Sequence, residues 1–274
     1  MTSFAFRKMR LGGAALTCYL TSVFLASSAQ LPTPLPSATN VLQRVLERAS
    51  QVAQGETGPK LTYSKRSITQ ELNSHGGVVS STEKKYNVVL IQGWPFERLI
   101  QIQGKQLSEA DLRKEQEREQ AFRNKIAGRE LKQRKDRKEA WITPELLARY
   151  HFTVVSNDIC RNRKAFVLAF KPKPGNPEET MEDKICNRFA GLLWVDSEDA
   201  EIARLEVHLT DDLSLGWLGM LGSLKECNLT AQRQRMPEGT WVNTKHVLHI
   251  VGRKLVSTMR YRSIEESSDF RPGT

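Results

Sequence analysis

The chain is dominated by stretches in which apolar and polar residues alternate, as they do in a β-strand that buries one face. The alternation is most regular between residues 202 and 209, where Ala203, Leu205, Val207 and Leu209 are separated by Arg204, Glu206 and His208. The runs AFVLAF (165–170) and FAGLLWV (189–195) are apolar on both faces instead. We expect apolar cover on both sides of those two strands.

Patterns of this kind predict about eleven strands joined largely as hairpins, and therefore a mainly β protein with some α-helix. The predicted strands are Leu61–Leu72, Val78–Ile91, Pro95–Gln103, Tyr150–Asp158, Lys164–Phe170, Asn187–Asp196, Ile202–Leu209, Asn228–Arg235, Thr240–Val251, Lys254–Ile264 and Ser268–Phe270. We expect them to form one strongly curved antiparallel sheet with helices on one of its faces.

Helical spacing of apolar residues is confined to a few places. Thr39 can cap a helix whose apolar positions are Val41, Leu42, Val45, Leu46, Ala49 and Val52. A much more charged helix is predicted from Ser108 to about Glu139, within an insertion of about residues 108–149, since Ser108 and Asp111 resemble a capping box. Thr143 and Pro144 begin a further short helix.

The N-terminus has the three parts of a secretory signal peptide over residues 1–29. Arg7, Lys8 and Arg10 precede an apolar run that is shorter than the roughly 20 residues a membrane span requires. Residues 30–38 follow as a proline-rich leader, and residues 39–274 are predicted to form a single domain. Export to the periplasm is therefore expected, while a retained membrane anchor is the alternative. Cleavage would lower the net charge from +10 to +7, because the segment carries three positive charges and no negative one.

Few residues are arranged for catalysis or metal binding. His246 and His249 lie three positions apart on a predicted strand and therefore point to opposite faces. The acidic residues Asp196, Glu198 and Asp199 are interpreted as a solvated turn between two strands. The sequence has no zinc-binding helix motif, phosphate-binding glycine loop or nucleophile elbow. We predict no catalytic residue, no metal site and no cofactor, and hence no enzyme; the charge pattern also lacks the signature of a nucleic-acid-binding protein.

A site for hydrophobic cargo is the better hypothesis for the group of residues, although for any one of them packing in a core is the favoured interpretation. A curved sheet covered by an amphipathic helix and an apolar loop would enclose a hydrophobic cavity. The candidate lining residues are Phe166, Leu168 and Phe170 on one strand and Leu192 and Trp194 on the next, with Trp217, Leu218, Met220 and Leu221 as a lid.

Three cysteines follow the signal segment: Cys160, Cys186 and Cys227. In an oxidising compartment one disulfide and one free thiol are expected. Cys160 and Cys186 flank neighbouring predicted strands and are the favoured pair, while three unpaired thiols are the alternative.

Two segments resemble a known family: GWPFERLIQIQGKQLSEADLRKEQER (93–118) and GLLWVDSEDAEIARLEV (191–207). They are similar to outer-membrane lipoprotein-sorting proteins of the LolA/LolB-like superfamily, and the similarity extends over most of residues 40–270. The resemblance implies an unclosed β-barrel with helices on its concave side and a cavity for lipoprotein acyl chains. The charged helix departs from the compact carriers of the family.

The resemblance and the residues together predict a non-catalytic periplasmic carrier of lipoprotein acyl chains or other hydrophobic cargo, with transient association with membranes. The alternative is an envelope-stress signalling or protein-interaction module of the same fold. In that case the charged helix, residues 108–139, would be the surface that binds a protein partner.

Overall fold

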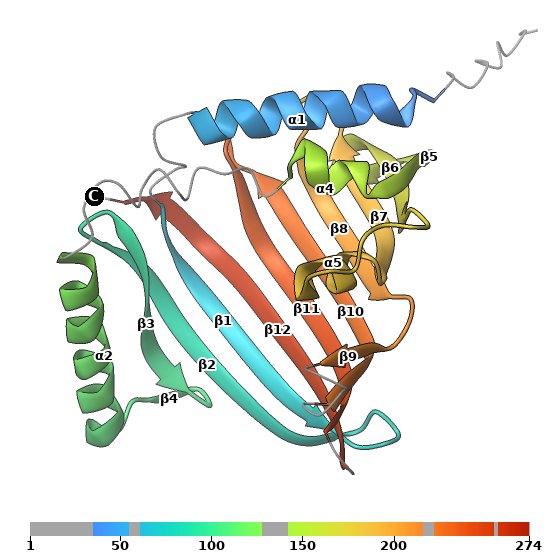
Figure 1. The fold of residues 1–274 in the computed structure, drawn as a ribbon. Coiled ribbons are helices and arrows are strands. Elements are labelled where there is room, and N and C mark those ends of the chain that lie inside the picture. Colours follow the sequence, from blue (N-terminus) through green and yellow to red (C-terminus); the bar gives the residue numbers. More distant parts are fainter. Residues whose placement is uncertain (1–34, 55–60, 128–141, 216–221, 255–256, 274) are drawn as a thin grey trace, which may run out of the picture. The chain divides into compact units, whose positions relative to one another are not determined.

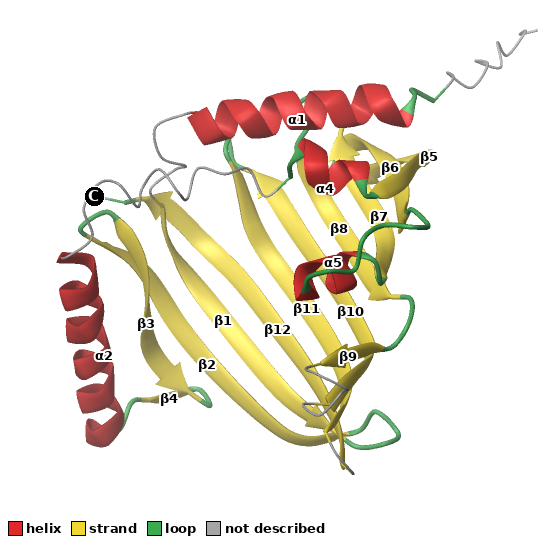
Figure 2. Ribbon diagram, in the orientation of Figure 1, coloured by secondary structure: helices red, strands yellow, loops and turns green. Residues whose placement is uncertain are grey.

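The computed structural model describes residues 35–54, 61–127, 142–215, 222–254 and 257–273, all within one compact unit, Leu35–Thr274. The unit is mainly β, and its strands form a single 12-stranded antiparallel sheet with few helices (Figures 1 and 2). The strand order is β4-β3-β2-β1-β12-β11-β10-β8-β7-β6-β5, with β9 paired to β10 beside this path. The predicted signal peptide lies outside the described residues.

The strands agree closely with the alternation in the sequence. Their bounds are β1 Leu61–Leu72, β2 Val78–Ile91, β3 Trp94–Ile102, β4 Lys105–Gln106, β5 Tyr150–Cys160, β6 Arg163–Pro172, β7 Phe189–Asp196, β8 Ile202–Leu209, β9 Leu213–Leu215, β10 Gly222–Arg235, β11 Trp241–Lys254 and β12 Ser257–Pro272. The short strands β4 and β9 were not predicted. The last two predicted strands are one strand, β12, whose backbone turns to a positive φ of 57° at Asp269.

The sheet is open, as predicted, since β4 and β5 end the strand order without pairing to each other. It is not strongly curled, however, so the predicted strong curvature is wrong. Strong bending requires bulges that act together at matching places in neighbouring strands. Here the register shifts occur in separate strand pairs and at scattered positions, for example between Thr62 and Ser64 near the start of β1 and between Val154 and Ser156 in the middle of β5.

Helix α1 (Ala38–Gln54) covers one end of the sheet and forms the main core with it. Val41 and Val45 from α1 pack with Leu168, Leu193 and Val195 from β6 and β7, and all five are buried. The helix begins one residue before the predicted cap: Ser37, not Thr39, accepts a hydrogen bond from the N–H of Asn40 through its Oγ, at 3.2 Å. The face of the sheet that carries this core is called the α1 face below.

Helix α2 (Glu109–Ala127) is the described part of the predicted charged helix, and it covers the edge of β3. Glu115 is buried on α2 and accepts a hydrogen bond from the backbone N–H of Leu99, 3.1 Å from its Oε1. Arg118 donates to the backbone carbonyl of Glu97. These contacts satisfy strand-edge groups that a neighbouring strand would otherwise bind.

Two short helices complete the unit: α4 (Pro144–Ala148) and α5 (Met181–Cys186). Thr143 caps α4, with proline in its first turn, as predicted. Helix α5 was not predicted. Its N-terminus is a capping box formed by Thr180 and Asp183, a pattern that can be recognised in the sequence. Among the described residues, no helix is long and apolar enough to cross a membrane.

Candidate functional site

The α1 face continues beyond the core that α1 covers. Leu205 on β8 packs against that core. Two residues further along the strand, Val207 pairs with Leu229 on β10, and Leu229 pairs with Leu248 on β11. The register therefore places Val207, Leu229 and Leu248 in one row on the α1 face, and each is only half-buried. We call these three residues the apolar row.

A second pair of residues widens the apolar row. Cys227 and Ile250 are paired across β10 and β11, on the same face and two positions along, and both are half-buried. The reverse face of β8 and β10 is polar, with Glu206, His208, Asn228 and Thr230.

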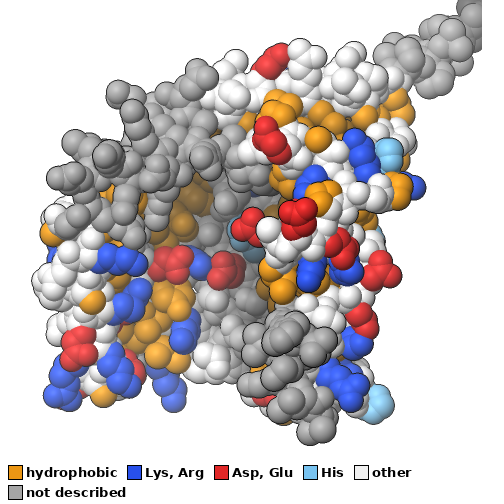
Figure 3. All heavy atoms as spheres, in the orientation of Figure 1, with side chains coloured by type: hydrophobic (Ala, Val, Ile, Leu, Met, Phe, Trp, Pro, Cys, Tyr) orange, Lys and Arg blue, Asp and Glu red, His pale blue; other side chains and the backbone are white. Residues whose placement is uncertain are grey.

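The side of the molecule shown in Figure 3 is hollowed between α2 and the helices opposite it, and hydrophobic side chains are visible inside the hollow.

The structure separates the residues that the sequence assigned to one cavity. Phe166, Leu168 and Phe170 lie on the α1 face, where they belong to the core beneath α1. Leu192 and Trp194 lie on the reverse face, in another cluster. They pair with Ala169 and Val167, whose side chains point away from the α1 face. The two groups therefore cannot line one cavity. The predicted lid residues Trp217, Leu218, Met220 and Leu221 lie outside the described residues.

The α1 face becomes polar toward β12, β1 and β2. There Lys65 is largely buried, with its Nζ 2.9 Å from Glu97 Oε1 and 3.1 Å from Glu265 Oε1. Burial alone would lower the pKa of Lys65, but its bonds to the two carboxylates raise it above its ordinary value. Burial likewise raises the pKa of the neighbouring Tyr63. The α1 face thus has an apolar half and a half that carries paired charges.

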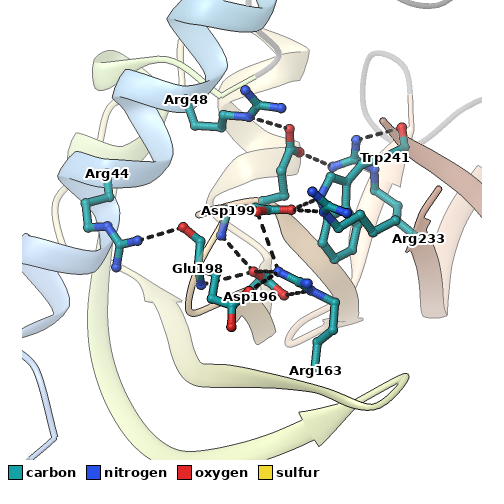
Figure 4. A network of polar contacts seen from close by, with 10 residues as sticks. Arg44, Arg48, Arg163, Asp196, Glu198, Asp199, Arg233 and Trp241 are labelled. Carbon is teal, nitrogen blue, oxygen red and sulfur yellow. Dashed lines mark hydrogen bonds and ion pairs between the residues drawn. The ribbon is translucent and has the colours of Figure 1, made fainter. Parts of the chain in front are cut away.

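The acidic turn between β7 and β8 is not solvated, contrary to the sequence interpretation (Figure 4). The side chain of Asp196 is 1% exposed and is bound by Arg163 at 2.6 and 2.9 Å. It also accepts hydrogen bonds from the backbone N–H groups of Glu198 and Asp199 at 3.0 and 2.8 Å. Asp199 accepts from Trp241 Nε1 at 2.8 Å. Only Glu198, which is 77% exposed, matches the expectation of a solvated side chain.

Hydrogen bonding keeps these carboxylates ionised. Burial alone would raise the pKa of Asp196, but Arg163 and the two backbone N–H groups hold it below its ordinary value. Burial also acts to raise the pKa of Asp199, and bonds from Trp241 and Arg235 lower it. Because each carboxylate is already committed to a cation or to N–H donors, this turn is a structural network and offers no free acid or base.

The same turn holds α1 against the sheet. Arg44 donates from its Nη2 to the carbonyl oxygens of Ser197 and Glu198 at 3.0 and 3.1 Å. Arg48 binds Glu201 at 2.9 Å, and the other carboxylate oxygen of Glu201 binds Arg233 on β10 at 2.7 Å. Figure 4 shows α1 joined to the sheet through these contacts. Sequence reasoning missed Glu201 and both arginines of α1, because the pairs are more than 150 positions apart.

The predicted disulfide between Cys160 and Cys186 is wrong: Cys160, Cys186 and Cys227 are all free. Cys160 pairs with Arg163 at the beginning of β6, whereas Cys186 precedes the end of β7 that pairs with Phe170. Arg163 and Phe170 lie seven positions apart on an extended strand, or roughly 23 Å at 3.3 Å per residue. A disulfide requires Cα atoms about 6 Å apart.

Among the residues that the structure describes, no three His, Cys, Asp or Glu side chains gather as metal ligands would. His246 pairs with Ala231 and His249 with Asn228, so the two histidines occupy opposite faces, as predicted. Among the described residues, the apolar row is a surface that continues the core without being completed by it.

No protein-family model and no curated protein matches the chain. Three solved structures with which it shares similarity are an outer membrane lipoprotein-sorting protein domain from Vibrio parahaemolyticus, a LolA superfamily protein from Nitrosomonas europaea, and a chain of the Pseudomonas aeruginosa MucA/MucB complex. The Vibrio domain has 11% identity and a TM-score of 0.34, with 84% of this chain and 91% of that chain covered. The Nitrosomonas protein has 11% identity and a TM-score of 0.30, with 88% and 95% covered. The Pseudomonas chain has 11% identity and a TM-score of 0.26, with 86% and 99% covered.

The first two of these structures carry the name of the fold family that the two sequence segments resemble. The low identities and TM-scores assign no function to this chain.

Proposed function

We propose that the protein is an exported, non-catalytic carrier that binds the acyl chains of lipoproteins or of other amphiphiles on the α1 face. The observation that supports this function is the half-buried apolar row, Val207, Leu229 and Leu248, which continues the core without being completed by it. Apolar surface left in contact with water is costly, and a bound hydrocarbon chain would remove it at about 0.8 kcal/mol per buried CH₂ group.

The division of the α1 face suggests how the cargo would lie. Its hydrocarbon would pack along the apolar row and Ile250, and its polar end would be directed toward Lys65, Glu97 and Glu265. Rows of paired residues connect these two regions across β11, β12 and β1. An amphiphile matches this surface better than a wholly apolar molecule, since the charged half cannot be desolvated without cost.

The network at the β7–β8 turn would keep the site ready for binding. Arg44 and Arg48 fix α1 over one end of the face, so α1 does not collapse onto the apolar row when cargo is absent. A site held open in this way loses less conformational entropy when cargo binds.

Two neighbouring substitutions on β10 test this function. Leu229→Gln places a polar side chain in the apolar row, whereas the control Thr230→Gln places the same side chain on the reverse face. We expect the Leu229 variant to bind the apolar dye 1-anilinonaphthalene-8-sulfonate about tenfold more weakly than wild type, and the control to bind it normally. Protein purified without detergent should carry acyl-chain mass in native mass spectrometry. Equal dye binding by both variants, together with lipid-free protein, would refute the proposal.

A second role, as a protein-interaction module, is favoured by a different observation: the exposed outer edge of β5. The predicted partner surface on the charged helix stays a prediction. One side of α2 is already occupied, since it contacts β2 and β3 through Glu115, Glu119, Phe122 and Ile126. Its other side is solvated and carries charges of both signs.

A further inference from the structure

The two edges of the sheet differ in whether another element covers them. The edge of β3 is covered by α2, whose Glu115 and Arg118 bind the backbone of Leu99 and Glu97. At the other end, β5 pairs only with β6, and no described strand pairs with its outer side. Proteins normally protect such edges because they accept an additional strand from another chain.

The second half of β5 is exposed to solvent. Residues 155–159 are all exposed, and they include Val155 at 49% and Ile159 at 70%. In contrast, Phe152 and Val154 in the first half pack against the core under α1. A register shift between Val154 and Ser156 separates the halves. The open segment is thus five residues long, or roughly 17 Å.

Backbone groups of the open segment face outward. Cys160 and Arg163 pair directly across a two-residue turn, Arg161–Asn162, in which both residues have positive φ, 49° and 63°. This turn makes Cys160 and Arg163 a hydrogen-bonded pair, so the N–H and C=O of Asn157 and Ile159 point away from β6. The Ile159 N–H is satisfied locally by Asp158 Oδ1 at 2.7 Å.

The hairpin that carries this edge is held rigidly. Arg161, at the turn, donates to Gln234 and Thr244 on β10 and β11, at 3.1 Å each. Asp158 accepts from Trp194 Nε1 on β7 at 2.8 Å. Positive φ at two residues other than glycine costs free energy, and such strain persists only where surrounding contacts over-determine the conformation. A fixed edge loses little entropy when a strand is added.

We propose that the edge of β5 binds an extended segment of another polypeptide, which adds to the sheet as a further antiparallel strand. The segment would be uncharged and β-branched in its centre, to match Val155, Ser156 and Asn157. It would carry an acidic residue at the end that lies near Ile159, because Lys164 is exposed on β6 directly beside Ile159. Backbone pairing supplies affinity in this mode, and the side chains supply specificity. A second copy of this chain is the poorer occupant, since each copy would still carry a net charge of +7 after cleavage of the signal segment.

The test uses the full protein and a fluorescein-labelled peptide, Asp-Thr-Val-Thr-Val-Thr-Asp, measured by fluorescence anisotropy. The control peptide carries N-methyl groups on its five central residues, which prevents backbone pairing. Asn157→Pro removes one outward N–H from the edge of β5, where proline is tolerated, and Asn157→Ala keeps that N–H. We expect Asn157→Pro to weaken binding of the peptide about tenfold, Asn157→Ala to leave it unchanged, and the methylated peptide not to bind.

The proposal is overturned if the peptide does not bind, if the methylated peptide binds equally well, or if the proline and alanine variants behave alike. Sedimentation velocity supplies a further check, because a dimer of wild type that Asn157→Pro dissociates would make the occupant a second copy and refute a partner segment. Circular dichroism of both variants establishes that they fold. The proposal is independent of cargo binding: Leu229→Gln should bind the peptide as wild type does.

Discussion

Replacing Asp196 with asparagine removes one charge from the network that joins the β7–β8 turn to β6. The carboxylate of Asp196 receives two hydrogen bonds from Arg163, at 2.6 and 2.9 Å, and two from backbone N–H groups. The amide retains one acceptor oxygen, but its NH₂ group would face a guanidinium donor. Loss of one partner from a buried ion pair typically costs about 3–5 kcal/mol.

The cost should lie below that range here, because Arg163 is 25% exposed and keeps contacts with Glu198 at 3.0 Å and Asp199 at 3.5 Å. We therefore expect Asp196→Asn to lower the free energy of unfolding by about 2–3 kcal/mol at pH 7. For a unit of this size the melting temperature should fall by about 5–10 °C.

The effect depends on pH in a defined direction. The pKa of Asp196 is lower in the folded protein than its ordinary value. At pH values between the folded and the unfolded pKa, the unfolded chain therefore binds more protons than the folded protein does. Its contribution to stability is therefore complete above the unfolded pKa of about 3.9 and is lost as the pH falls through the folded pKa. Asparagine does not titrate, so the difference between wild type and variant should disappear in acid.

Urea unfolding followed by tryptophan fluorescence, at several pH values from about 7 to 2, measures this difference directly. The control is Glu198→Gln, which also removes a partner of Arg163 but at a side chain that is 77% exposed. The control should leave stability unchanged. A difference for Asp196→Asn that is equally large at pH 2 and pH 7 would mean that shape, and not charge, explains its cost.

Two further substitutions test the packing of the sheet. In Gly191→Ala the new Cβ would lie 1.9 Å from a backbone oxygen of β8, so we expect a loss of about 3 kcal/mol or more in urea unfolding, whereas Gly252→Ala, whose Cβ meets its nearest atom at 3.5 Å, should be tolerated. If both glycine variants are equally stable, β7 and β8 are not as closely packed as described. Glu115→Ala removes the acceptor that α2 supplies to the Leu99 N–H, so that amide should exchange hydrogen faster and stability should fall by about 1–3 kcal/mol. Glu117→Ala, on the exposed side of α2, should change neither, and an unchanged Leu99 exchange rate in Glu115→Ala would show that α2 does not protect this edge.

Local patterns in the sequence were sufficient for most of the elements. The alternation from Ala203 to Leu209 predicted β8 with its correct bounds and its single apolar face. Thr143 and Pro144 predicted the beginning of α4, because a cap and a proline act within one turn of backbone and can be recognised from neighbouring residues.

The candidate site depends on which residues of neighbouring strands pair with each other, and the sequence does not show this register. The sequence predicts that Leu192 and Trp194 share a cavity with Phe166, because it shows both strands as apolar but does not show their register. The register of β6 against β7 places the two groups on opposite faces. Likewise, Cys160 and Cys186 flank adjacent strands but lie at opposite ends of β6.

The sequence by itself determined most of the strands and helices and which of their faces are apolar, because those properties depend on residues within a few positions of one another. Only the tertiary structure decided which faces meet, since pairing in a sheet joins residues far apart in the chain. Asp196 became a buried partner of Arg163 in this way, and Val207, Leu229 and Leu248 became one row. The open edge of β5 was also decided at this level, because whether a strand lies at an edge depends on where every other strand pairs.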